Sequence, residues 1–186
     1  MLYGTAWKKD KTSDLVTAAF RLGFRGVDTA CQPKHYQEPL VGDALRNMLR
    51  TGVVKRDEVW IQTKFTSVDG QDPKRIPYDP RKSPPDQARE SIEVSRKNLG
   101  MEVIDSWVLH SPMRGGFDKT LEVWKAMEEA VDEGKVQFLG ISNCYKLDFF
   151  TRLYQLARHK PLVLQNRLVS VTPDVGHCGQ SCFTIV

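Results

Sequence analysis

Long apolar runs are missing from this chain, and so is any strong excess of charge of one sign. No uninterrupted apolar stretch approaches the roughly 20 residues of a membrane-spanning helix, and no signal-peptide pattern precedes the first strand-like residues. Lys and Arg number 27 against 23 Asp and Glu, and the formal net charge of +4 is scattered along the sequence. Nucleic-acid-binding domains cluster their basic residues instead. We therefore expect neither a membrane nor a nucleic acid as a partner.

Cysteine is scarce as well. The sequence has 4 cysteines at irregular spacing, which is typical of proteins whose thiols stay reduced, and this predicts a cytoplasmic location. His177, Cys178 and Cys182 offer three ligands for a metal, but they lack a fourth and fit no common zinc spacing, so no metal site is expected. A glycine-rich G-x-G-x-x-G turn after a strand is also missing, which argues against a Rossmann dehydrogenase.

Strand-like and helix-like segments alternate along most of the chain. The strand candidates are short apolar segments that each end in a polar residue: Leu2–Trp7, Phe24–Thr29, Val59–Lys64, Ile104–His110, Val136–Asn143 and Leu162–Gln165. The amphipathic stretches between them are helix candidates: Ser13–Leu22, Leu40–Thr51, Pro85–Leu99, Lys119–Glu133 (ended by Gly134) and Lys146–His159. Crossovers of this length join parallel strands, so the sequence predicts one α/β domain with a parallel sheet.

Polar side chains mark the ends of the predicted strands. They are Thr5, Asp28, Lys64, His110, Ser142 with Asn143, and Gln165. In a (β/α) barrel the carboxyl ends of the strands all meet on the face that carries the active site. Any one of these residues, taken alone, also fits an ordinary role such as a helix cap or a buried core imidazole. Their recurrence at successive strand ends favours a catalytic site, and the proline-rich segment 67–84 is expected to form a functional or flexible loop on the same face.

Five short motifs occur in a characteristic order and at characteristic separations. They are Gly26–Ala30, Gln62–Lys64, Leu109–Pro112, Gly140–Asn143 and Gln165–Asn166. Together they make the sequence resemble the aldo-keto reductase superfamily. The resemblance implies a TIM barrel of the (β/α)8 type, of which residues 1–167 encode about six of the eight strands. It also implies NADP(H) as cofactor and reduction of an aldehyde or ketone to an alcohol by hydride transfer.

The resemblance assigns a catalytic tetrad. Asp28 and Lys64 match the buried ion pair of the family, Tyr36 matches the general acid, and His110 matches the histidine that orients the substrate carbonyl. A phenol with a pKa of about 10 is a poor acid near neutral pH, and a neighbouring ammonium group lowers that pKa by stabilising the phenolate. A neutral His110 would donate a hydrogen bond to the carbonyl oxygen as negative charge builds there.

The identity of the acid leaves an alternative open. The segment between Asp28 and Tyr36 is longer than in most family members, and aligning the sequence on Glu38 places His35 at the tyrosine position. A further possibility is that the loop supplies no acid at all. Tyr36 is the only tyrosine on this loop, so we predict that Tyr36 is the acid.

The resemblance also assigns binding residues. Thr5, Asp28, Ser142, Asn143 and Gln165 are expected to contact the cofactor, with Ser142, Asn143 and Gln165 holding its nicotinamide carboxamide. The substrate is expected to be a small carbonyl compound that contacts Trp7 and His110. Relatives of full length are expected to be monomers.

The resemblance ends near Arg167. A complete barrel needs about 250 residues, whereas the chain has 186, and residues 168–186 are expected to form a divergent, unstructured tail. We expect the ancestral protein to be longer, with this tail arising from alternative splicing, intron retention or a faulty gene model. The chain could then be an active reductase or a catalytically inactive truncated isoform. Schiff-base chemistry at Lys64 is a third, more remote hypothesis.

Overall fold

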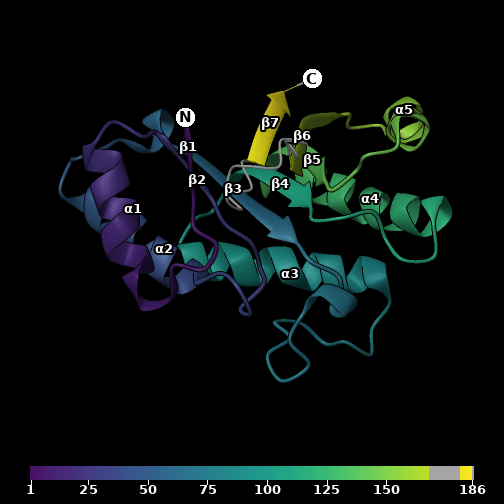
Figure 1. Ribbon diagram of the computed structural model, residues 1–186, viewed down its shortest axis with the longest axis horizontal. Helices are drawn as coiled ribbons and strands as arrows, with labels where there is room; N and C mark the ends of the chain where they lie inside the picture. The colour runs from purple at the N-terminus through teal and green to yellow at the C-terminus, as the bar shows by residue number, and fades with distance from the viewer. Residues whose placement is uncertain (168–180, 186) are drawn as a thin grey trace, which may run out of the picture.

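A curved parallel sheet forms the centre of the molecule (Figure 1). The computed structural model describes residues 1–167 and the backbone of residues 181–185. Six parallel strands pair in chain order: β1 (Leu2–Gly4), β2 (Gly26–Asp28), β3 (Trp60–Phe65), β4 (Ile104–Leu109), β5 (Val136–Ser142) and β6 (Pro161–Arg167). This order is that of the first six strands of a (β/α)8 barrel, so the predicted fold class and the parallel sheet are confirmed.

In the described part of the chain, five α-helices lie in an arc around the outside of the sheet (Figure 1). They are α1 (Thr12–Arg21), α2 (Glu38–Arg50), α3 (Pro84–Leu99), α4 (Phe117–Asp132) and α5 (Leu147–Leu156), with short 3-10 turns at Lys9–Lys11, Arg56–Glu58 and Val68–Gly70. The local sequence explains the ends of α3. Ser83 caps its first turn by accepting from the backbone N–H of Asp86, and Gly100 ends it at φ 69°. Gly134 follows α4 at φ 69°, as the sequence predicted.

Strand β3 shows how the sheet separates the core from the site. Successive side chains of a strand point to opposite faces. Ile61 and Phe65 are fully buried in the hydrophobic core between the sheet and the helices. Gln62 and Lys64, on the alternate positions, make their contacts with polar groups on the inner face of the curved sheet. The alternation therefore delivers Lys64 to the interior of the half-barrel.

The C-terminal residues differ in part from the expected tail. Residues 181–185 form strand β7 (Ser181–Ile185), which pairs antiparallel with β6 and aligns Leu164 with Thr184. An open edge of β6 would present unpaired backbone N–H and C=O groups, and a strand that pairs with them satisfies both partners. Residues 168–180 and 186 lie outside the described part, and so does the candidate metal cluster around His177 and Cys178. Among the helices of the described residues, none is long and apolar enough to cross a membrane.

Candidate active site

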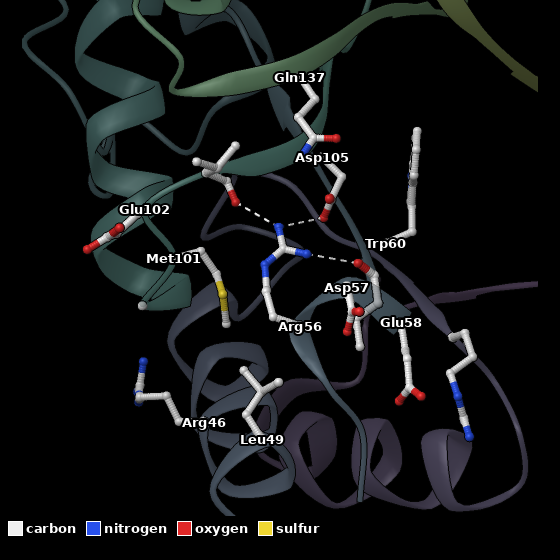
Figure 2. A pocket seen from close by; sticks show the side chains of 14 residues that line it. Arg46, Leu49, Arg56, Asp57, Glu58, Trp60, Met101, Glu102, Asp105 and Gln137 are labelled. Carbon is white, nitrogen blue, oxygen red and sulfur yellow. Dashed lines mark hydrogen bonds and ion pairs between the residues drawn. The ribbon is translucent and has the colours of Figure 1, made fainter. Parts of the chain in front are cut away.

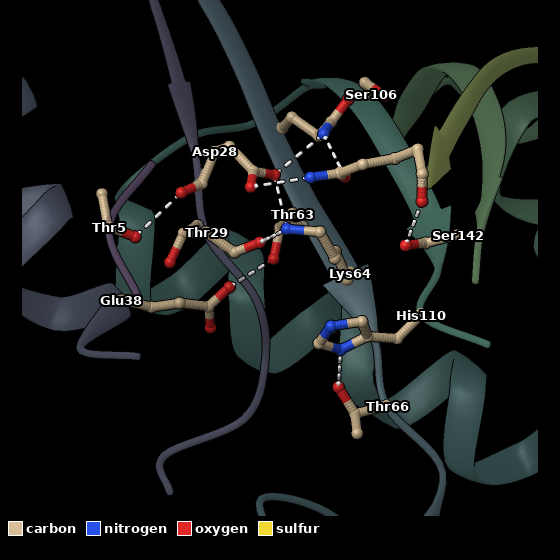
Figure 3. Close-up of polar contacts among 12 residues, drawn as sticks. Thr5, Asp28, Thr29, Glu38, Thr63, Lys64, Thr66, Ser106, His110 and Ser142 are labelled. Atoms are coloured by element: carbon tan, nitrogen blue, oxygen red, sulfur yellow. Dashed lines mark hydrogen bonds and ion pairs between the residues drawn. The ribbon is translucent and has the colours of Figure 1, made fainter. Parts of the chain in front are cut away.

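A buried ion pair lies where β2 and β3 end (Figure 3). Lys64 Nζ lies 2.5 Å from Asp28 Oδ1 and also donates to the carbonyl oxygen of Thr29 at 2.8 Å. Only 1% of Lys64 and 5% of Asp28 is exposed. A charge this deeply buried is tolerated because its partner and further hydrogen bonds replace the lost water. An amine bound in this way is poorly suited to act as a Schiff-base nucleophile.

A chain of amides connects this ion pair across the inner face of the sheet. Gln62 Nε2 donates to Asp28 Oδ1 at 2.8 Å and to Gln165 Oε1 at 3.1 Å. Gln165 Nε2 donates to Asp28 Oδ2 at 3.2 Å, and Ser106 Oγ donates to Gln62 Oε1 at 3.0 Å. The contact between Asp28 and Gln165 joins β2 directly to β6, so the curvature of the sheet brings its distant strands together on this face.

Tyr36, and not His35, lies beside the ion pair. The Tyr36 ring centre is 5.2 Å from Lys64 Nζ and 6.1 Å from the centre of the His110 ring. A tight turn produces this arrangement, because the backbone N–H groups of His35 and Tyr36 both donate to the carbonyl oxygen of Gln32 at 3.0 Å. The His35 ring packs instead on Trp7, with 3.7 Å between the ring centres. The longer loop therefore still brings a tyrosine to Lys64.

Burial dominates the electrostatics of both Tyr36 and His110. Burial raises the pKa of Tyr36 above its ordinary value, and the ammonium of Lys64 offsets this only in part. The net depression expected from the sequence is therefore wrong for this structure, because the loss of water outweighs the nearby cation. Burial, with Lys64 as the next cause, lowers the pKa of His110 to about 3. His110 is accordingly neutral at pH 7, as predicted.

Three predicted cofactor residues gather at the neighbouring ends of β5 and β6. Ser142 Oγ donates to the carbonyl oxygen of Gln165 at 2.6 Å, and the backbone N–H of Asn143 donates to the same oxygen at 3.1 Å. Asn143 turns the chain there in the left-handed region at φ 52°, and its Nδ2 donates to the carbonyl oxygen of His110 at 2.8 Å. A hydroxyl and two carboxamides in one place suit a ligand that both donates and accepts hydrogen bonds.

Thr5 and Trp7 take different places at the end of β1. Thr5 is fully buried, and its hydroxyl and backbone N–H both donate to the carbonyl oxygen of Asp28, at 2.9 and 3.0 Å. Its described contacts thus join β1 to β2. Trp7 is 65% exposed, has φ 64° and donates its backbone N–H to the carbonyl oxygen of His35. Its indole therefore stands at the rim, supported by the His35 ring.

A hollow of about 290 Å³ opens beside His110. It lies between the segment that follows β3 and the segment that follows β4. An ion pair of 2.7 Å between Arg114 and Asp69 connects the two segments. The predicted loop 67–84 therefore lies on the face of the strand carboxyl ends. Lining residues of the hollow include Gln32, Thr66, Ser67, Gly70, Ser111 and Asn143.

A larger hollow, of about 1110 Å³, lies at the opposite end of the strands (Figure 2). Its central cation, Arg56, donates to the carbonyl oxygens of Val59 and Val103 and to Asp105 Oδ2, each at 2.9 Å. The donors of this arginine are thus engaged in joining β3 to β4. The amino ends of barrel strands commonly serve stability, and we assign this hollow no catalytic part.

Two polar residues at the site, and one on the helix side behind it, were given no role by the sequence patterns. Thr66, just past the end of β3, contacts the His110 ring, and Gln62 contacts Asp28. Glu38 is buried on the helix side of the sheet, where the hydroxyls of Thr63 and Ser95 donate to its carboxylate. Gln62 belongs to one of the five motifs and Thr66 lies two positions beyond Lys64, so the motif and the proximity to a strand end were the available signals.

The fold is that of a (β/α) barrel with a polar cluster at the carboxyl ends of its strands, and comparison with known proteins gives the family. Residues 1–174 match the aldo/keto reductase family, and the chain belongs to this family. It is 31% identical over 158 residues to the 9,11-endoperoxide prostaglandin H2 reductase of Trypanosoma cruzi, covering 85% of this chain and 48% of that protein. It is 26% identical over 182 residues to the NAD(P)H-dependent D-xylose reductase of Pachysolen tannophilus, covering 86% and 52%.

The crystal structure of an aldo-keto reductase of Bombyx mori in complex with NADP has a similar fold. The TM-score is 0.74 at 24% identity, and the match covers 90% of this chain and 54% of that one. This likeness supports the fold. The chain spans about half the length of the curated relatives that it matches.

Proposed function

We propose that this chain carries the proton-transfer side of an NADP(H)-dependent reductase that converts an aldehyde or ketone to an alcohol. The observation that supports it is the convergence of Tyr36, Lys64 and His110, from three separate segments, at the carboxyl ends of parallel strands. Reduction of a carbonyl needs a hydride on carbon and a proton on oxygen. The described residues are suited to the second of these tasks.

Tyr36 is the proposed general acid. The phenol is protonated at neutral pH, so its proton is available when the substrate oxygen becomes negative. Burial raises its pKa and makes it a weaker acid, so the transfer depends on stabilisation of the phenolate. Lys64, 5.2 Å from the ring centre, then stabilises the phenolate that remains. Asp28 holds the ammonium group in place through their ion pair.

His110 is the proposed orienting residue. It is neutral at pH 7, so one ring nitrogen carries a proton that can be donated to the carbonyl oxygen. Its ring stands at 67° to the Tyr36 ring with 6.1 Å between the ring centres, so the two side chains are direct neighbours. Trp7 would form an apolar wall for the substrate at the rim.

Ser142, Asn143 and Gln165 fit a nicotinamide carboxamide by their chemistry. Among them they offer a hydroxyl and two amides at neighbouring strand ends. NADP(H) held there would supply the hydride. The Bombyx mori relative was solved with NADP and the Pachysolen tannophilus relative is named for NAD(P)H, which supports this cofactor. Thr5 and Asp28 would stabilise the same site, because the Thr5 hydroxyl donates to the carbonyl oxygen of Asp28 and joins β1 to β2 there.

Turnover tests the proposal. We expect NADPH oxidation with 4-nitrobenzaldehyde, and a fall in kcat of at least about 100-fold in Tyr36→Phe, because a general acid contributes that much. Tyr154→Phe removes the hydroxyl of a tyrosine on α5 that is 40% exposed, and serves as the matched control. His35→Gln should keep most of the activity. A wild-type rate no higher than that of Tyr36→Phe would overturn the proposal.

A measurement of binding separates the active enzyme from a catalytically inactive isoform. A ligand that binds only the folded state raises the melting temperature. An active reductase should melt higher in the presence of NADP⁺, and Gln165→Ala should reduce this shift. An absence of both turnover and shift would favour the inactive isoform.

A further inference from the structure

Thr66 contacts the ring of His110 through one of its two nitrogens. Thr66 Oγ1 lies 2.7 Å from His110 Nδ1. Figure 3 shows the other ring nitrogen pointing away from Thr66. Thr66 follows β3, the strand that carries Lys64, while His110 follows β4, so the contact joins two neighbouring strand ends.

The position of Thr66 is fixed from several directions. Its carbonyl oxygen accepts from the Tyr78 hydroxyl at 2.5 Å and from Gln71 Nε2 at 3.2 Å. Its methyl group lies against Gly70, where an added Cβ would come within 2.7 Å of Thr66 Cγ2. Only 5% of Thr66 is exposed. The methyl group therefore has one place to lie, and the hydroxyl is left facing the imidazole.

The backbone of His110 is fixed as well. Its N–H donates to the carbonyl oxygen of Phe65 at 2.9 Å. Its own carbonyl oxygen accepts from Asn143 Nδ2 at 2.8 Å and from Ser111 Oγ at 2.7 Å. The orientation of the ring about its last side-chain bond then depends on what each ring nitrogen contacts.

Hydrogen-bond accounting decides the direction of the Thr66–His110 bond. A hydroxyl has one proton to donate, and a neutral imidazole has one N–H and one accepting nitrogen. If Nδ1 carried the proton, the hydroxyl proton of Thr66 would have no acceptor among the residues that the structure describes, and a buried donor without a partner is costly. If Thr66 donates to Nδ1, the buried hydroxyl proton and Nδ1 are both paired, and only the Nε2–H is left without a partner among the described residues. The burial that keeps His110 neutral supports this arrangement.

We propose that Thr66 is a positioning residue that donates its hydroxyl proton to Nδ1 of His110, and thereby fixes the ring with its own proton on Nε2. This rests on the proposed function, because an Nε2–H is the donor that the substrate carbonyl needs. Without the Thr66 hydroxyl the ring can turn over or change tautomer, and either change takes the N–H away from the substrate.

Nitrogen NMR of the protein with ¹⁵N-labelled histidine tests the assignment without any turnover. At neutral pH we expect His110 to show a protonated Nε2 and an accepting Nδ1. In Thr66→Val, which keeps the shape and lacks the hydroxyl, both resonances should move toward averaged values. Thr66→Ser should restore the wild-type pattern. A proton on Nδ1 in the wild type, or an unchanged spectrum in Thr66→Val, would overturn the proposal.

Kinetics provides the second readout. Loss of one neutral hydrogen bond corresponds to roughly a tenfold change, so kcat of Thr66→Val should fall about that much while KM changes little, and Thr66→Ser should recover. Thr12→Val is the matched control, since Thr12 is fully buried and donates to a single oxygen, that of Lys9, at 2.6 Å. A loss of kcat in Thr12→Val as large as in Thr66→Val would mean a general effect of stability and would overturn the assignment.

The two readouts separate the two proposals. An Nε2-protonated His110 that depends on Thr66, in a protein without turnover, would support the role of Thr66 and defeat the proposed function. Turnover with the proton on Nδ1 would do the reverse. Melting curves of the valine and serine variants identify any loss that comes from unfolding.

Discussion

Burial determines the charge states of the individual residues at this site. Lys64 and Asp28 are buried together, and removing either one would leave a lone charge in the interior. Burial shifts the pKa of each group toward its neutral form, so that the pKa of the Tyr36 phenol rises and the pKa of the His110 imidazole falls. The result is a phenol and an imidazole that are both uncharged at pH 7 beside a charged lysine.

The lowered pKa of His110 predicts a pH dependence of stability. Its folded pKa is about 3, below the ordinary 6.5. Between these two pH values His110 is protonated in the unfolded chain and neutral in the folded protein. Lowering the pH across this window therefore favours unfolding, and above it His110 has no effect on stability. The free energy of unfolding of the wild type minus that of His110→Gln should fall as the pH drops from 6.5 toward 3, by at most about 1.4 kcal/mol per pH unit.

Urea unfolding at a series of pH values measures this difference. Comparison with His110→Gln cancels the titration of all other groups that the substitution leaves unchanged. A difference that stays constant from pH 7 down to pH 4 would contradict the prediction, and would mean that His110 is as accessible to protons in the folded state as in the unfolded chain.

Helix α2 is fixed to its neighbours by a buried carboxylate. Glu38, in its first turn, accepts from Thr63 on β3 and from Ser95 and Asn98 on α3. Burial raises the pKa of this carboxyl, and the three donors counteract the rise. One turn further along, Gly42 lets the two helices approach closely, because a Cβ there would lie 2.2 Å from the carbonyl oxygen of Asn98. The helix that follows Tyr36 is thereby fixed against the sheet.

Gly42→Ala should therefore destabilise the protein. The added methyl group meets backbone atoms of α3, which cannot move aside as a flexible side chain would, and overpacking of this kind costs about 1–3 kcal/mol. Gly4→Ala is the control, since a Cβ on Gly4 has no heavy atom within 4 Å. Urea unfolding should show the loss for Gly42→Ala and little change for Gly4→Ala. Equal stability of the two variants would show that α2 and α3 can separate without cost.

The whole molecule is an open, curved sheet whose inner face is held by polar contacts. Gln165 on β6 reaches Asp28 on β2, and Ser106 on β4 reaches Gln62 on β3. Strand β7 pairs with β6, while within the described part of the chain β1 pairs only with β2. Pairing by β7 therefore protects the edge next to the proposed nicotinamide site.

Removal of residues 168–186 should expose that edge. The backbone groups of β6 would lose their partners in β7, and an unpaired strand edge promotes association between chains. We expect the shortened chain to melt at a lower temperature and to form larger species in size-exclusion chromatography. Replacing residues 181–185 with glycine and serine should have a similar, smaller effect at unchanged length. A shortened chain that stays as stable and as small as the full one would contradict this role of β7.

The sequence by itself determined the order of elements and the residues at the strand ends. Alternating apolar and amphipathic segments are local patterns, so β3 to β6 and all five helices lie close to where they were expected, and β1 and β2 are shorter only because their ends continue as irregular backbone. Asp28, Lys64, His110 and Ser142 were identifiable because each lies at or next to the end of a strand, and parallel strands end on one face.

Only the tertiary structure decided how these residues meet. The bond from Gln165 to Asp28 spans 137 positions and that from Thr66 to His110 spans 44, and neither leaves a pattern along the chain. The choice between Tyr36 and His35 beside Lys64 depended on a tight turn, and the pairing of β7 depended on the open edge of β6. Periodicity reports which face a residue occupies, whereas hydrogen bonds between strand ends exist only once the sheet has curved.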